Sequence, residues 1–86
     1  MRSEMENKST QYFMAQFSES INRQRFIDDW QQEPGNNGFG NPPVDFQWDE
    51  SGEMIVRTFG WDEASLKRTI SIAVHRSAPK CQIIWM

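Results

Sequence analysis

The fold class is decided by residues 44–57, whose sequence is VDFQWDESGEMIVR. Apolar and polar side chains alternate over residues 44–48, which predicts a strand with one buried face. Residues 50–52 follow as a three-residue hairpin loop, in which Gly52 takes the left-handed conformation of a bulge. This loop length predicts three cross-strand pairs, which are Trp48 with Met54, Phe46 with Val56, and the oppositely charged Asp45 with Arg57.

The sequence after the hairpin also has a period of two. Residues 60–65 predict a polar connection, with room for one helical turn. Residues 66–75 predict a third strand, because Ile70, Ile72 and Val74 alternate with smaller or polar side chains. Residues 81–86 predict a last strand. The four strands, taken in chain order, predict an antiparallel meander.

The sequence before the hairpin has helical spacing. Residues 34–43, PGNNGFGNPP, are a loop by composition. Residues 9–32 contain neither Pro nor Gly, and their apolar residues fall mostly three or four positions apart, at Phe13, Phe17, Ile21, Ile27 and Trp30. This spacing predicts a helix over 9–32. Because serine is a weak helix former, a break into two helices near Ser18 and Ser20 stays open.

The chain has 86 residues, which is enough for one domain with a single core. We expect a flexible tail over residues 1–8 and one α+β domain over residues 9–86, made of a helix (9–32), a loop (33–43) and a sheet (44–86). The expected architecture is a two-layer sandwich, in which the helix packs on one face of a four-stranded antiparallel meander.

One helix of this length covers only one face of such a sheet. Strand parity then leaves an apolar set of side chains on the other face, and an exposed sheet face this apolar predicts an interaction surface. The candidate partner-binding residues are Ile55, Arg57, Phe59, Trp61, Ile84 and Met86, together with Phe39 of the loop. Arg57 is the charged member of this aromatic patch, and arginine is common among residues that dominate binding energy.

Two other interpretations of these apolar residues stay open. Phe59 and Trp61 can fold back over the rim of the sheet, or the loop that contains Phe39 can cover the outer face as an internal lid. The apolar last strand, which includes Trp85, can instead lie at a sheet edge and pair with a strand of another chain.

Residues able to perform chemistry are few. His75 is the only side chain that titrates near neutral pH without help, and no phosphate-binding loop or nucleophile motif accompanies it. One histidine and one cysteine are too few for a zinc site. The acidic pairs at residues 49–50 and 62–63 flank turns, where aspartate bonds the local backbone. We therefore predict no catalytic residue, no metal, no cofactor and no enzymatic activity. Cys81 is expected to be a small buried hydrophobe.

These features predict a small soluble protein-binding module that masks a partner sterically, as an inhibitor, an immunity or antitoxin-like component, or a regulatory accessory protein. The expected partner is another protein or a second copy of the chain, and we expect neither a membrane nor a small-molecule substrate. The alternative is single-stranded nucleic acid bound on the open sheet face. Nine basic against twelve acidic residues, a net charge of −3, count against it. A single cysteine and the lack of a long apolar run favour the cytoplasm.

Overall fold

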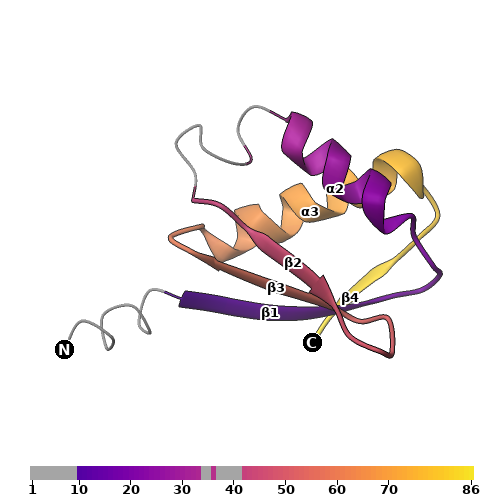
Figure 1. The fold of residues 1–86 in the computed structure, drawn as a ribbon, viewed down its shortest axis with the longest axis horizontal. Coiled ribbons are helices and arrows are strands. Elements are labelled where there is room, and N and C mark those ends of the chain that lie inside the picture. Colours follow the sequence, from indigo (N-terminus) through magenta and orange to yellow (C-terminus); the bar gives the residue numbers. More distant parts are fainter. Residues whose placement is uncertain (1–9, 34–35, 37–41) are drawn as a thin grey trace.

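The computed structural model describes residues 10–33, 36 and 42–86. Their elements follow the order β1 (Thr10–Phe17), α2 (Arg23–Gln32), β2 (Asp45–Trp48), β3 (Met54–Phe59), α3 (Glu63–Ser77) and β4 (Ile83–Trp85) (Figure 1). The predicted tail over residues 1–8 and the candidate residue Phe39 lie outside the described residues. Within the described part of the chain, neither helix is long and apolar enough to cross a membrane.

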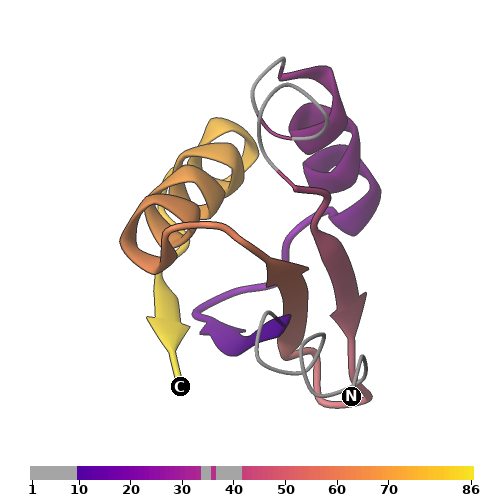
Figure 2. The same cartoon turned by 90° about the vertical axis from the view of Figure 1, so that its left-hand side faces the viewer.

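The strands form one sheet in the order β2-β3-β1-β4, and every neighbouring pair is antiparallel. Both described helices lie on the same side of this sheet, so the molecule has two layers (Figures 1 and 2). The β-α-β-β-α-β order is that of the split βαβ motif. The α+β class and the four antiparallel strands are confirmed. The predicted meander is wrong, because β1 lies between β3 and β4.

The hairpin of β2 and β3 has the predicted register. Trp48 pairs with Met54, Phe46 with Val56 and Asp45 with Arg57. Gly52 has a φ of 88°, the left-handed conformation that favours glycine. The Asp49 carboxylate accepts hydrogen bonds from the backbone N–H groups of Ser51 and Glu53, both at 2.9 Å, and so holds the loop closed.

The predicted helix over residues 9–32 is wrong in its first half, which is the strand β1. Apolar residues spaced by four, such as Phe13 and Phe17, fit a period of two as well as a helix. Pairing with β3 and β4 on both sides decides between them. The alternative of a break into two helices near Ser18 and Ser20 does not occur, because these residues follow the end of a strand and precede α2. Helix α2 then begins at the cap residue Asn22, whose side chain accepts from the Arg25 N–H at 3.0 Å.

The predicted third strand over residues 66–75 is also wrong, because this segment lies within helix α3. Its buried side chains follow a helical spacing, at Leu66, Ile70, Ala73 and Val74. Ile72, expected on the covered side of the sheet, is 51% exposed on the helix surface. Asp62 caps the helix by accepting from the Ser65 N–H at 3.0 Å. The Ser65 backbone N–H, with the Ser65 side chain as the second cause, holds the pKa of Asp62 below its ordinary value.

Aromatic rings fill the space between the helices and the sheet. The Phe26 and Trp30 rings of α2 meet the Phe46 ring of β2 edge-on, with centroids 4.9 and 5.0 Å apart. Trp61 packs against Trp30 at 6.1 Å and is only 9% exposed. The prediction that Trp61 lies on the outer face is therefore wrong. Trp61 is held in the core, where its indole N–H donates to the Pro42 carbonyl at 2.9 Å.

Candidate functional site: the outer sheet face

The outer face is the side of the sheet that the two described helices leave uncovered (Figure 2). Its side chains alternate with those that face the helices, as strand geometry requires. They are Thr10, Tyr12, Met14 and Gln16 from β1, Asp45 and Gln47 from β2, Ile55, Arg57 and Phe59 from β3, and Ile84 from β4, with Met86 directly after it.

Large apolar side chains are more than half exposed on the outer face. The exposed fraction is 58% for Tyr12, 54% for Phe59, 54% for Ile84 and 65% for Met86. Single exposed apolar residues are ordinary on protein surfaces, but a contiguous group is not.

The sheet register makes these side chains contiguous. Tyr12 is one step diagonally from Phe59, because Thr10 is the direct partner of Phe59. Met14 pairs with Ile55, and both are partly buried. The Met86 N–H donates to the Met14 carbonyl at 2.9 Å, which places Met86 beside Met14. The result is an apolar strip that crosses the sheet diagonally, made of Phe59, Tyr12, Ile55, Met14, Met86 and Ile84.

Charged groups border the apolar strip. The Arg57 guanidinium pairs with the Asp45 carboxylate at 3.0 Å, and both side chains are about half exposed. The Gln16 side-chain amide donates to the Glu53 carboxylate at 2.7 Å. The border thus carries one cation, Arg57, and two carboxylates, Asp45 beside it and Glu53 at the other end of β3, so its formal charge is slightly negative.

Most residues predicted from the sequence do come together. The outer face holds Ile55, Arg57, Phe59, Ile84 and Met86. Trp61 lies in the core. Because Phe59 stays exposed and Trp61 packs on the helix side, these two rings do not fold back over the outer face. The strand β4 lies at a sheet edge, as the edge-pairing alternative requires.

Sequence reasoning missed Tyr12 and Met14, which lie in the middle of the apolar strip. Both were assigned to the predicted helix over residues 9–32. A signal was present in the sequence of β1, TQYFMAQF, because Phe13, Ala15 and Phe17 occupy every second position and face the helices. This period of two identifies Tyr12 and Met14 as outward-facing once the segment is treated as a strand.

The residues considered for chemistry have structural partners. The His75 Nε2 atom lies 2.8 Å from the Cys81 carbonyl and ties the end of α3 to the segment before β4. Cys81 is buried, as expected for a small hydrophobe. Among the residues that the structure describes, no three His, Cys, Asp or Glu side chains group together in a way that suits a metal ion.

Comparison of the chain with protein-family models, with curated proteins and with solved structures gave no match. A function therefore has to be inferred from the geometry of the chain itself. The feature of the fold that calls for an explanation is the apolar strip with its charged border, which the described helices leave uncovered; the loop that contains Phe39, considered above as a lid, lies largely outside the described residues.

Proposed function

We propose that this chain is a non-catalytic protein-binding module, which docks its outer face on a partner protein and masks the surface it covers. The supporting observation is the apolar strip, where Tyr12, Phe59, Ile84 and Met86 are each more than half exposed. An antiparallel sheet with one solvated face usually carries polar side chains on that face. Exposure of this apolar strip to water costs free energy, and a partner surface that covers the strip removes that cost.

The apolar strip supplies a large part of the free energy that a complex requires. Covering roughly 300 Å² of apolar area contributes on the order of 7 kcal/mol, at about 25 cal/mol per Å². Association costs about 4–15 kcal/mol in lost freedom of motion, so the strip needs support from its border. Tyr12 and Arg57 are adjacent, and tyrosine and arginine are enriched among residues that dominate binding.

The border defines the chemistry of the partner. Arg57 is already paired with Asp45, and Glu53 adds a further negative charge. The partner surface is therefore apolar at its centre and carries hydrogen-bond donors or basic groups at its rim. By masking the partner surface that it covers, the chain acts as an inhibitor, an immunity or antitoxin-like component, or a regulatory accessory protein. The partner protein can also be a second copy of the chain, bound through the same outer face.

The test is capture of binding partners from the native host with two matched variants. Ile84→Glu introduces a charge into the apolar strip, whereas Ile72→Glu introduces the same charge at a similarly exposed isoleucine on α3. We expect wild type and Ile72→Glu to retain the same partner and Ile84→Glu to lose it. The molecular mass in solution, measured for all three proteins, detects a second copy as the partner. Equal capture and equal mass for all three would contradict the proposal.

Single-stranded nucleic acid is a second candidate ligand, favoured by one arrangement on the outer face. Tyr12 lies directly across from Arg57 on β1 and Phe59 lies two positions after Arg57 on β3, and bases stack on exposed rings beside cations. The pairing of Arg57 with Asp45 weakens its attraction for phosphate, and Glu53 adds negative charge to the same face. Titration with labelled oligonucleotides at two salt concentrations separates the candidates, since absence of binding at low salt eliminates this one.

A further inference from the structure

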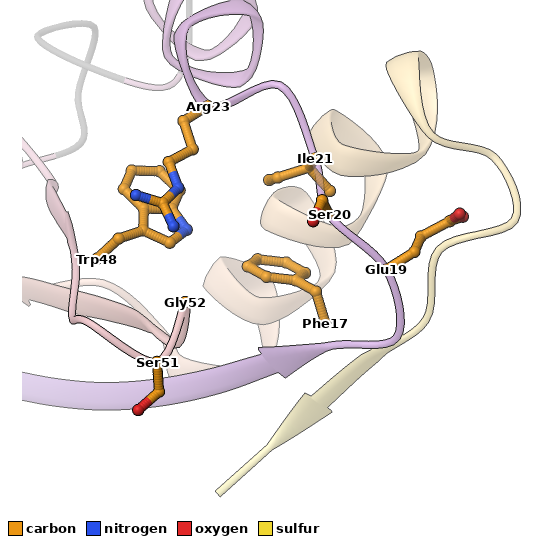
Figure 3. Close-up of a pocket in the computed structure, with 8 residues that line it drawn as sticks. All are labelled: Phe17, Glu19, Ser20, Ile21, Arg23, Trp48, Ser51 and Gly52. Carbon is orange, nitrogen blue, oxygen red and sulfur yellow. The ribbon is translucent and has the colours of Figure 1, made fainter.

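A cavity of about 370 Å³ opens at one end of the molecule, on the helix side of the sheet (Figure 3). It lies between the end of β1, the beginning of α2 and the loop that joins β2 to β3. None of its lining residues belongs to the outer face, so it is separate from the proposed docking surface. Its volume falls within the range of about 300–1,000 Å³ that is usual for pockets that hold small molecules.

Three large apolar side chains take part in the lining of the cavity, although most of its lining surface is polar. Figure 3 shows the Phe17 ring, the Ile21 side chain and the Trp48 indole directed toward the open space. Two polar lining residues, Glu19 and Ser51, direct their side chains away from it. A planar apolar group therefore finds an aromatic ring on each side of the cavity and an aliphatic side chain between them.

Arg23 supplies a positive charge at the mouth of the cavity. Its side chain reaches from the first residue of α2 and lies over the Trp48 ring, with the guanidinium carbon 5.3 Å from the ring centroid (Figure 3). The ion pairs found among the described residues involve Arg57, Lys67 and Arg76, and none involves Arg23. Stacking on an indole holds a guanidinium in place and leaves its N–H groups free to donate.

The local field adds to the charge of Arg23. The first turn of α2 contains no acidic residue, although the amino terminus of a helix favours negative charge. Arg25 lies in the same turn. Arg23 and Arg25 therefore place positive charge on the α2 side of the cavity, whereas Glu19 and the acidic loop between β2 and β3 place negative charge on its other sides.

We propose that the cavity binds a small organic carboxylate, which places its carboxylate on the Arg23 guanidinium and its apolar body against Phe17, Ile21 and Trp48. One guanidinium matches one carboxylate through two parallel hydrogen bonds. A phosphate dianion fits less well, because Arg23 is the only basic residue among the described residues that line the cavity, and a single positive charge does not balance two negative ones. The assignment is independent of the outer face.

The test uses nuclear magnetic resonance titration of the full chain with three probes. Phenylacetate has the proposed chemistry, phenylacetamide has the same ring without the charge, and inorganic phosphate has charge without the ring. The reporters are the Trp48 indole N–H and the Gly52 amide, since both residues line the cavity. We expect saturable shifts with phenylacetate at a Kd of about 1 mM, and binding at least about tenfold weaker for the other two probes.

Matched variants complete the test. Arg23→Gln removes the proposed cation and is expected to weaken phenylacetate binding by about tenfold, whereas Arg25→Gln removes a charge of the same turn and changes it less than about twofold. Both arginines are exposed, so both variants keep the wild-type spectrum elsewhere. Equal binding of phenylacetamide or phosphate, equal losses in the two variants, or no saturable shift with phenylacetate would each overturn the proposal. Ile84→Glu leaves the binding unchanged, whatever happens at the outer face.

Discussion

Tyr12 and Arg57 lie directly opposite each other on the two central strands, β1 and β3, with both side chains exposed on the outer face. Asp45 extends this row onto β2, where it pairs with Arg57 at 3.0 Å. An aromatic ring, a cation and an anion thus follow one another across three strands. Tyr12 belongs to the apolar strip, and Arg57 and Asp45 form the charged border beside it.

The first prediction concerns the ion pair in this row. Arg57→Ala is expected to change the free energy of unfolding by less than about 1 kcal/mol, because the pair is exposed to solvent. Capture of the partner protein is expected to fall, since the Arg57 guanidinium lies beside Tyr12 in the docking surface. Urea unfolding and capture measure the two effects. Arg25→Ala on α2 is the matched control, and a loss of capture equal to that of Arg57→Ala would refute the assignment of Arg57.

The second prediction separates two aromatic residues that are two positions apart. Trp61→Ala is expected to lower the free energy of unfolding by about 3–5 kcal/mol, because its buried ring packs on Trp30. Phe59→Ala is expected to cost less than about 1 kcal/mol, because its ring is exposed, but to reduce partner capture. Thermal unfolding and capture on both variants check this division. A stable Trp61→Ala protein that fails to bind would reverse the roles.

The third prediction concerns pH and the cap of α3. The hydrogen bond from the Ser65 N–H lowers the pKa of Asp62 in the folded chain below 3.8, so the charged cap contributes stability above that ordinary value. This contribution is lost as the pH falls through the lowered pKa. Asp62→Asn keeps a capping side chain that does not titrate. The free energy of unfolding is therefore expected to fall more in wild type than in Asp62→Asn between about pH 7 and pH 2, and equal falls would contradict the assignment.

The hairpin could be predicted from the sequence because the residues that determine it are close together in the chain. Loop length and strand alternation specify which residues of β2 and β3 pair, and Gly52 supplies the positive φ that the loop requires. Parity then placed Ile55, Arg57 and Phe59 together on one face. Ile84 and Met86 joined them because β4 also alternates.

The remaining elements depend on contacts between distant segments. Phe13 and Phe17 are spaced by four, which suits a helix or a strand, and only pairing with β3 and β4 makes β1 a strand. In α3, Ile70 and Val74 also fit both periods. The helix signal in the sequence there was Asp62, a favoured capping residue, and the structure buries Ala73, which strand alternation places on the outer face. Tyr12 was missed at the candidate site for the same reason.

Oxidative footprinting of the purified complex tests the central claim most directly. Hydroxyl radicals modify exposed side chains, and Tyr12 and Met86 report on the outer face while Ile72 and His75 report on the helix layer. If the outer face is the docking surface, modification of Tyr12 and Met86 falls at least about fivefold on binding, as burial at an interface core requires, and that of Ile72 and His75 is unchanged. Protection of Ile72 and His75, with Tyr12 and Met86 still modified as in the free chain, would contradict the account.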